Sequence, residues 1–130
     1  MEEIETYKQE VEKNPDDAEA HYNLGVAYYD SGKYQEAIEA CKQVIRLDPD
    51  DAKVHNNFAA AYGKSGKYQE EIESYKQAIK IDPDYVKAHC NLGVAYHYSN
   101  DRNSALEQYE ILKNLDPYLA NLLFVEIYSE

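Results

Sequence analysis

The feature that most constrains the fold of this chain is a sequence period of 34 residues. Asp48-Pro49, Asp82-Pro83 and Asp116-Pro117 are each 34 residues apart, and Asn14-Pro15 lies another 34 residues upstream. A fixed period of this length is typical of repeat proteins, in which each unit buries its apolar side against the next unit. One structural unit is therefore repeated along the 130 residues.

Other short motifs keep the same phase and indicate what each unit contains. "NLGVAY" occurs at 23 and again at 91, and "SGKYQE" occurs at 31 and again at 65. Each proline is predicted to open a helix, where its missing N–H does no harm, with the preceding Asp or Asn as the capping residue. Gly32 and Gly66 supply the left-handed residue that ends a helix. Each unit is therefore predicted to be a helix, a tight turn, a second helix and another tight turn.

The period of 34 and the order His, Leu-Gly, Tyr, Gly-Lys-Tyr, Ala and Asp-Pro resemble the tetratricopeptide repeat (TPR). The resemblance implies an all-α fold, a right-handed superhelical α-solenoid of stacked antiparallel helix pairs. The expected parts of this single domain, 1–130, are a half-repeat helix, three full repeats and a capping helix, at 2–13, 18–51, 52–85, 86–119 and 118–129.

Each first helix carries a histidine followed two residues later by an asparagine. On a helical wheel His21 and Asn23 point to opposite faces, and the histidine side also carries Leu24 and Tyr28, which makes it the buried stripe. Equivalent residues in neighbouring repeats lie about 10 Å apart, whereas zinc needs nitrogens about 2 Å from one ion. We therefore predict no metal or catalytic site, and we expect hydrogen-bonded scaffold residues at His21, His55 and His89.

Two further features concern the second helices. Cys41 and Cys90 have neither the number nor the spacing of a disulfide framework or a zinc knuckle, and Cys41 falls on a core stripe. Glu71 stands where repeats 1 and 3 have Ala37 and Ala105, at a position that the TPR family keeps small. Its carboxylate is expected either to extend outwards from a slightly widened helix contact or to pair with a nearby cation.

The face of each first helix opposite the histidine is predicted to line the concave side of the solenoid. It carries three lysines against one Glu and one Asp, although the whole chain has a formal charge of −12, and Asn56 falls on it as well. Its lysines, tyrosines, small apolar residues and row of amides suit an extended peptide. The predicted peptide-binding residues are Tyr22, Asn23, Val26, Tyr29, Lys53, Asn57, Lys64, Lys87, Asn91, Val94 and Tyr98.

Asn23, Asn57 and Asn91 form the central row of this face. A side-chain amide donates to and accepts from a peptide backbone, whatever the side chains of the ligand are. Three such residues about 10 Å apart span about 20 Å, or about six residues of an extended chain. The row resembles the asparagine ladder of some peptide-binding TPR proteins. The alternative is that Asn is a framework residue that duplication has repeated.

Some TPR adaptors grip the C-terminal carboxylate of heat-shock chaperones with a set of Lys, Asn, Asn, Lys and Arg. In this chain only Asn57 and Lys87 match that set, and Tyr22, Val26 and Asn91 occupy the other three places. Two matches are too few for a carboxylate clamp. The groove lysines nevertheless favour a partner with an acidic or C-terminal segment through long-range attraction.

The stretch "YLANLLFVEIYSE" places apolar residues on several sides of one helix. Leu119 and Leu123 can cover the end of the third repeat, but Phe124, Val125 and Tyr128 lie on other sides and are predicted to stay exposed. Such a patch commonly marks an interface, either with a second copy of the chain or with a part of a longer protein. The alternative function is therefore a self-assembling scaffold, a homo-oligomer that forms through the C-terminal helix.

Composition and motifs exclude several other classes. With 25 acidic and 13 basic residues, the surface repels nucleic acid and anionic membrane. No run approaches the roughly 18 apolar residues of a membrane span, and "MEEIETYKQE" has no signal-peptide character, so a cytoplasmic protein is expected. There is no phosphate-binding glycine loop, nucleophile elbow or His-Glu-x-x-His motif. We predict no enzyme and no cofactor, and a protein or peptide as the partner.

Overall fold

A computed structural model of the chain describes residues 2–129. Within this range the chain is all α-helix, turns and short connections. The elements follow in the order α1 (Glu2–Lys13), α2 (Ala18–Asp30), α3 (Tyr34–Leu47), α4 (Ala52–Lys64), α5 (Tyr68–Ile81), α6 (Val86–Tyr98), α7 (Arg102–Leu115) and α8 (Pro117–Tyr128). No helix in the described range is long and apolar enough to cross a membrane.

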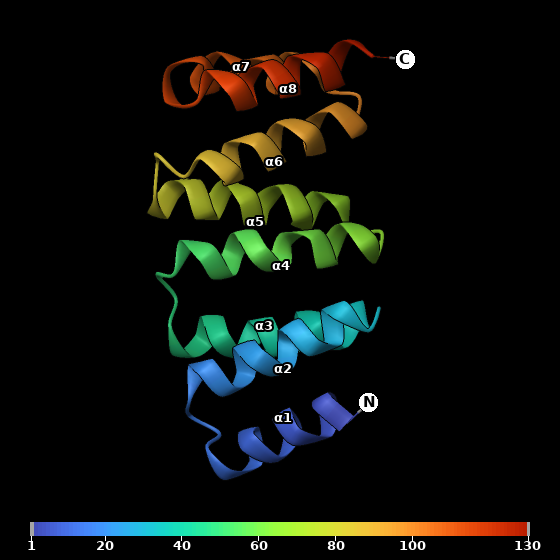
Figure 1. The fold of residues 1–130 in the computed structure, drawn as a ribbon, viewed down its shortest axis with the longest axis vertical. Helices are drawn as coiled ribbons and strands as arrows, with labels where there is room; N and C mark the ends of the chain where they lie inside the picture. The colour runs from blue at the N-terminus through green and yellow to red at the C-terminus, as the bar shows by residue number, and fades with distance from the viewer. Residues whose placement is uncertain (1, 130) are drawn as a thin grey trace.

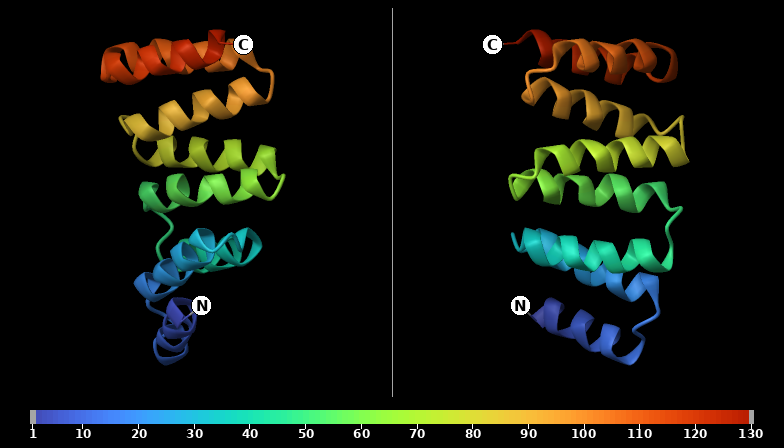
Figure 2. Two further views of the ribbon diagram at one scale, coloured as in Figure 1. Left: turned by 45° about the vertical axis from the view of Figure 1, so that its right-hand side comes forward. Right: turned by 180° about the vertical axis from the view of Figure 1, so that it is seen from behind.

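The eight described helices stack in chain order, with the two chain ends at opposite ends of the stack (Figure 1). Each helix contacts the next one along the chain, and α6 also contacts α8. The helix direction turns progressively along the stack, as the two views in Figure 2 show. The architecture is the all-α solenoid of stacked helix pairs that the family resemblance implies.

Three of the prolines lie in turns and do not open helices, which corrects the expectation from the sequence. α2 begins at Ala18 and α4 at Ala52, three residues after the preceding proline. α6 likewise begins at Val86, three residues after Pro83, but without a side-chain cap. For α2 and α4 the reason is an aspartate two residues after the proline. The side chains of Asp17 and Asp51 accept the backbone N–H two residues further on at 3.0 Å, and these caps set the first helical residue.

α8 is the one helix that begins at its proline, Pro117. The preceding residue, Asp116, accepts hydrogen bonds from the backbone N–H groups of Tyr118 at 3.1 Å and Leu119 at 3.2 Å. Asp116 is thus the N-cap of α8, and Pro117 is the first residue of the helix. α8 therefore covers Pro117–Tyr128 and starts one residue earlier than expected.

The turns that end the first helices follow the prediction. Gly32 and Gly66 have φ angles of 78° and 80°, and Asn100 takes the same left-handed conformation in the third repeat with φ 62°. Glycine adopts this conformation without steric cost, and Asn is among the residues that tolerate it best. These residues reverse the chain, so that each second helix packs antiparallel against the first.

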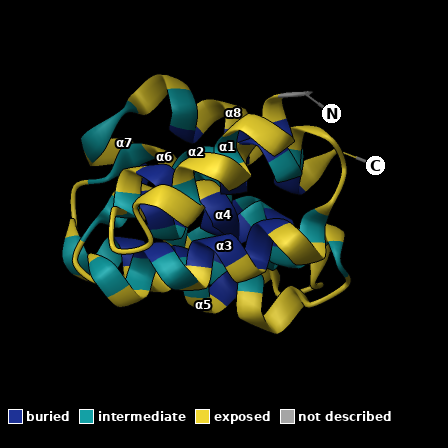
Figure 3. Ribbon diagram, turned by 90° about the horizontal axis from the view of Figure 1, so that it is seen from below, coloured by how far each residue is buried: buried dark blue, intermediate teal, exposed yellow. Residues whose placement is uncertain are grey.

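The hydrophobic core runs through the stack between neighbouring helices. Figure 3 looks along the stack and shows buried positions on the facing sides of α3, α4 and α6, with exposed positions around the outside. Cys41 is one of the fully buried side chains, with 2% of its surface exposed. Burial raises the pKa of its thiol to about 12, although the nearby positive charge of Lys42 opposes the shift. Cys41 is a core residue, as predicted.

Candidate functional site

The histidine row belongs to the scaffold, as predicted. Each Nε2 lies near the backbone oxygen of the proline six residues earlier: His21 and Pro15 at 2.8 Å, His55 and Pro49 at 3.3 Å, and His89 and Pro83 at 2.7 Å. Because a carbonyl only accepts, Nε2 carries the proton and donates it. These bonds hold the turns against the first helices. Within residues 2–129 no group of three or more His, Cys, Asp or Glu is arranged to hold a metal ion.

The opposite side of α2, α4 and α6 is hollowed, and we call this surface the groove. A hollow of about 260 Å³ lies between α2 and α4, one of about 650 Å³ lies between α4, α5 and α6, and one of about 330 Å³ lies at the starts of α2 and α4. Nine of the eleven predicted binding residues line these hollows; they are Tyr22, Val26, Tyr29, Lys53, Asn57, Lys64, Asn91, Val94 and Tyr98. The other two, Asn23 and Lys87, line none of the three.

Hydrogen bonds join groove side chains of neighbouring repeats. Asn57 Nδ2 donates to the Tyr22 hydroxyl at 2.9 Å, and Asn91 Nδ2 donates to Asn56 Oδ1 at 3.2 Å. Asn56 Nδ2 lies within 3.4 Å of Asn57 Oδ1 and 3.5 Å of the Tyr85 hydroxyl. The amides therefore connect α2, α4 and α6 across the groove before any ligand is present.

Asn56 does not lie on the open face as the helical wheel predicts, because only 6% of its surface is exposed. It is buried between α4 and α6, where its amide joins its own helix to the start of the next repeat. A buried amide needs hydrogen-bond partners, and Asn57, Asn91 and Tyr85 supply them. The wheel cannot show this burial, because it depends on the next repeat.

The three asparagines of the central row keep hydrogen-bonding capacity after these contacts. An amide side chain has two N–H donors and an oxygen with two lone pairs. Asn57 uses one donor and one lone pair, and Asn91 uses one donor. Asn23 has no side-chain hydrogen bond to another described residue, and it is partly exposed.

Glu71, which the sequence pattern does not place in the groove, reaches it from α5. With Tyr75 it lines the hollow of about 650 Å³. A Cβ built on Gly63 would lie 2.5 Å from Glu71 Oε1, so the carboxylate fills the space of the missing side chain. Repeats 1 and 3 have Tyr29 and His97 at the position of Gly63. The sequence signal for this placement is that repeat 2 differs from repeats 1 and 3 at both Gly63 and Glu71.

Of the two arrangements expected for Glu71, the pairing with a cation is not found, whereas the extension away from the helix contact is found in a modified form, because the carboxylate enters the wall of the groove. The residue is partly buried and does not extend freely into solvent, and no ion pair within 4.0 Å joins it to a described residue. Burial raises the pKa of its carboxyl, while a hydrogen bond from Tyr75 and the positive charge of Lys64 lower it. The Lys64 ammonium lies 5.9 Å from the ring centroid of Tyr34.

A second carboxylate lies next to Tyr98, at the same end of the first helices. The Tyr98 hydroxyl donates to Glu126 Oε2 at 2.6 Å, which joins α6 to α8. This hydrogen bond, together with the negative charge of Glu126, raises the pKa of the Tyr98 hydroxyl. Tyr98 itself is 69% exposed, so most of its surface is open to a ligand.

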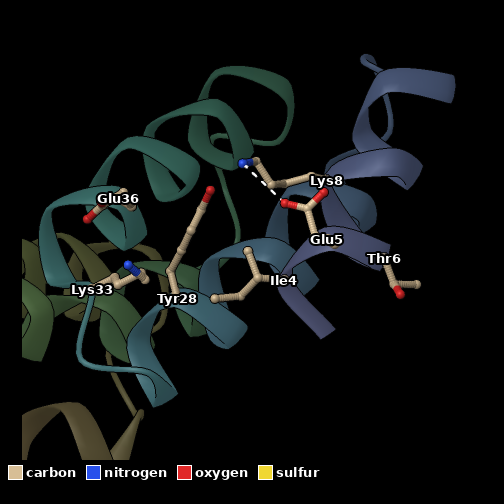
Figure 4. A pocket seen from close by; sticks show the side chains of 7 residues that line it. All are labelled: Ile4, Glu5, Thr6, Lys8, Tyr28, Lys33 and Glu36. Atoms are coloured by element: carbon tan, nitrogen blue, oxygen red, sulfur yellow. Dashed lines mark ion pairs between the residues drawn. The ribbon is translucent and has the colours of Figure 1, made fainter. Parts of the chain in front are cut away.

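A separate hollow of about 600 Å³ lies at the N-terminal end of the stack, between α1, α2 and the start of α3 (Figure 4). In Figure 4, Ile4 of α1 points toward Tyr28 of α2. The charged residues that line this hollow are of both signs, Glu5 and Glu36 with Lys8 and Lys33. Lys8 Nζ lies 3.7 Å from Glu5 Oε2. None of the predicted binding residues lines this hollow.

The C-terminal patch, defined as Phe124, Val125 and Tyr128, is exposed as expected. The three residues are 40%, 59% and 47% exposed. Phe124 contacts the rings of Tyr109 and Tyr128, with centroids 5.2 and 4.6 Å apart. The Arg102 guanidinium lies 4.9 Å from the centroid of Tyr128. Val125 has no such ring or cation contact and is the most exposed residue of the patch.

Comparisons with known proteins give the following matches. Three profiles described as "Tetratricopeptide repeat" match residues 18–51, 40–73 and 86–118, and one described as "TPR repeat" matches residues 61–99. The match at 40–73 runs from the second half of α3 through α4 into the start of α5, and so overlaps two repeats. No curated protein matches the chain in sequence.

Several solved structures share the fold. The crystal structure of MamA has a TM-score of 0.88 and 27% identity, over 95% of this chain and 72% of that one. The second TPR domain of the human RPAP3 protein, in complex with the HSP70 peptide SGPTIEEVD, has a TM-score of 0.76 and 30% identity, over 85% of this chain and 93% of that one. The second TPR of Spaghetti (RPAP3), bound to the HSP90 peptide SRMEEVD, has a TM-score of 0.71 and 32% identity, over 82% and 99%.

Proposed function

The chain belongs to the tetratricopeptide repeat family, and from this premise we propose that it is a protein-interaction module that binds an extended peptide segment of a partner protein in the groove. The observation that carries the proposal is the position of the Asn57 and Asn91 amides. Each lines a hollow of the groove and keeps hydrogen-bonding groups free for a ligand backbone. Peptide binding by the RPAP3 domains supports it.

The hydrogen bonds between repeats favour this role for the amides. Asn57 is held by Tyr22, and Asn91 is held by Asn56, so their side chains are oriented before a peptide arrives. Immobilising a side chain on binding costs about 0.5–1.5 kcal/mol, and this cost falls when the side chain is already held. One asparagine can therefore both connect neighbouring repeats and bind the backbone of a peptide.

Apolar and aromatic contacts must supply much of the affinity, because each hydrogen bond adds only about 0.5–1.5 kcal/mol. The hollow between α2 and α4 offers Val26 and the rings of Tyr22 and Tyr29. The larger hollow offers Val94 and the ring of Tyr98. Tyrosine provides a large contact area at a low cost in conformational entropy.

For the partner, we propose a segment that carries acidic residues near the starts of α4 and α6. Lys53 and Lys87 lie there, and both are exposed. The peptides in the two RPAP3 complexes end in Glu-Glu-Val-Asp. Since only Asn57 and Lys87 match the carboxylate-clamp set, we propose electrostatic attraction to an acidic segment and not a fixed grip on its C-terminal carboxylate. A cytoplasmic setting stays a prediction.

The test begins with selection of peptides that bind the full chain from a random library displayed on phage. Fluorescence anisotropy then measures the affinity of a selected peptide for the wild type and for Asn57→Ala. We expect a loss of about 3- to 10-fold, which corresponds to one or two hydrogen bonds. Asn114→Ala, an exposed site on α7, is the matched control. Equal affinity of Asn57→Ala and the wild type would refute the ladder.

A second candidate function is self-assembly through the C-terminal patch, and the exposure of Val125 favours it. Phe124 packs against two tyrosines, so its replacement would also disturb α8. Val125→Lys changes the patch without removing a ring contact. If the patch forms a dimer, light scattering across concentrations shows a dimer for the wild type and a monomer for Val125→Lys. A wild type that is monomeric at all concentrations rules this function out.

A further inference from the structure

Repeat 2 differs from its neighbours at two positions that lie against each other. Gly63 replaces the large side chains of Tyr29 and His97, and Glu71 replaces the small Ala37 of repeat 1 and Ala105 of repeat 3. The Glu71 carboxylate lies where a side chain on Gly63 would be. Because position 63 has no side chain, the Glu71 carboxylate lies in the wall of the groove and not in the contact between the two helices. This hollow therefore contains a carboxylate that the equivalent positions of repeats 1 and 3 lack.

The negative charge of Glu71 is not paired within the described chain. Lys64 lines the same hollow, and its positive charge opposes the rise in the pKa of the Glu71 carboxyl that burial causes. The Lys64 ammonium lies over the Tyr34 ring on the side of repeat 1, and no ion pair within 4.0 Å joins it to Glu71. Tyr75 donates a hydrogen bond to this carboxylate but brings no positive charge, so a half-buried carboxylate without an ion-pair partner gains from a cation supplied by a ligand.

The walls of the hollow suit a cation as well. Tyr68 and Tyr98 line it and are 61% and 69% exposed, so both rings are accessible. Ammonium and guanidinium groups are attracted to the faces of aromatic rings. Its volume of about 650 Å³ leaves room for a long side chain beside Val94 and Asn91.

Lys53 and the Glu71 hollow lie toward opposite ends of α4. Lys53 lies at the start of α4 and Gly63 at its end; these ten residues of helix place them about 15 Å apart. Lys87 starts α6, on the edge of Lys53. Glu126, bonded to Tyr98 at the end of α6, lies on the edge of Glu71. Neither edge carries a single sign of charge, because Glu19, Asp48 and Asp51 line the hollow of Lys53, and Lys64 lines the hollow of Glu71. The Tyr98 ring nevertheless lies between two carboxylates, Glu71 in its own hollow and Glu126 bonded to its hydroxyl, which favours a cation there.

We propose that the hollow around Glu71 is a subsite for a lysine or arginine side chain of the bound peptide. The ammonium or guanidinium group pairs with the Glu71 carboxylate, and its aliphatic stem lies between Tyr68 and Tyr98. The subsite rests on the proposed function and adds a selectivity to it. Ligands of this chain carry a basic residue that enters at Glu71.

The first test uses the peptides selected on the wild-type chain. We expect them to share a lysine or arginine at one position. Replacing that residue with norleucine, which keeps the aliphatic stem and removes the charge, is expected to weaken binding about tenfold. Selection of no peptide at all contradicts the proposed function. Selected peptides that lack a common basic residue contradict the subsite and leave the proposed function in place.

Three variants locate the effect. Glu71→Gln keeps the shape and removes the charge, and Gly63→Ala keeps the charge but displaces the carboxylate. Both are expected to weaken the lysine peptide about tenfold and to leave the norleucine peptide within about twofold. Glu73→Gln is the matched control, because it lies on the same helix, changes the net charge equally and pairs with Lys76 away from the groove. Equal losses for Glu73→Gln and Glu71→Gln would overturn the subsite.

A third readout does not depend on any selected peptide. The side-chain carboxyl ¹³C signal of Glu71 is followed by NMR while acetyl-lysine-methylamide or acetyl-norleucine-methylamide is added to the full chain at millimolar concentration. The lysine probe is expected to shift this signal in a saturable way, and the norleucine probe is not. Equal shifts with both probes, or a shift with neither, overturn the subsite.

Discussion

Phe58 of α4 packs directly against the backbone of Gly25 in α2. A Cβ built on Gly25 would lie 2.7 Å from Cζ of Phe58 and 3.2 Å from Cβ of Ala40. Phe58 is 2% exposed, so its ring has little space into which it could move. The close approach of α2 and α4 therefore depends on the absence of a side chain at position 25. Leu123 of α8 lies in the same way against Gly93 of α6, with Cδ2 2.6 Å from a built Cβ.

Gly25→Ala is expected to lower the free energy of unfolding by about 1–3 kcal/mol, because the added methyl group overpacks the contact with Phe58. Ala is more favourable than Gly inside a helix by up to about 1 kcal/mol, and the expected net loss already takes this into account. Gly63→Ala is the control, since its Cβ displaces only the flexible end of Glu71. Urea denaturation measures both. A Gly25→Ala variant at least as stable as Gly63→Ala would contradict the packing described here.

His89→Ala is expected to destabilise the protein by about 2–4 kcal/mol. His89 is buried, its Nε2 donates to the Pro83 carbonyl, and its Nδ1 lies 2.7 Å from the Gln108 amide. The substitution leaves a cavity, and it leaves the Pro83 carbonyl and the Gln108 amide without this hydrogen-bond partner. His55→Ala is expected to cost less than about 1 kcal/mol, because His55 is only partly buried and its bond to Pro49 is 3.3 Å long. Similar losses in thermal unfolding for both variants would disagree with this ranking.

Asn56→Ala is expected to cost about 1–3 kcal/mol of stability, because it removes a buried amide that connects α4 to α6 and leaves Asn91 without its partner. Asn23→Ala is expected to stay within about 0.5 kcal/mol, since Asn23 is partly exposed and bonds to no other described side chain. Chemical denaturation compares the two variants. If they unfold at the same denaturant concentration, the network of Asn56 contributes nothing to stability.

Glu71 is expected to make the stability of the wild type depend on pH. Burial raises the pKa of its carboxyl, so the folded state binds this proton more tightly than the unfolded state does. The resulting stabilisation is complete below the ordinary pKa of glutamate and is lost as the pH rises through the raised pKa. Wild type should therefore lose stability relative to Glu71→Gln as the pH increases through this window. Thermal unfolding of both proteins across the acidic pH range measures the difference, and a trend of the opposite sign contradicts it.

Cys41 is expected to resist thiol reagents in the folded protein. At about pH 8 a thiol with a pKa of about 12 is ionised in only about one molecule in ten thousand, and the thiolate is the reactive form. Burial also raises the pKa of Cys90, which is partly exposed. Reaction with Ellman's reagent should therefore be slow for the native protein and fast for both thiols in denaturant. Rapid labelling of Cys41 in the native Cys90→Ser variant would be inconsistent with its place in the core.

The division of each first helix into a buried and an open face could be predicted because it is a local property. His21 and Asn23 differ by two positions, and helical geometry alone places them on opposite sides. The hydrogen bonds of the histidines to the turns agree with this assignment. The prolines were less predictable, since Asp17 and Asp51 cap the helices that the Asn14-Pro15 and Asp48-Pro49 pairs were expected to open.

The sequence by itself determined the repeat, the helical solenoid and the residues available to the groove, because a 34-residue period and a helical wheel depend on spacing along the chain. Only the tertiary structure decided that Asn56 is buried and that Glu71 enters the groove. Both outcomes depend on residues 29 and 35 positions away, or on a facing helix: Asn56 contacts Tyr85 and Asn91, and Glu71 fills the space beside Gly63. The physical reason is that burial and free volume arise from the packing of neighbouring helices, whereas a wheel describes one helix alone.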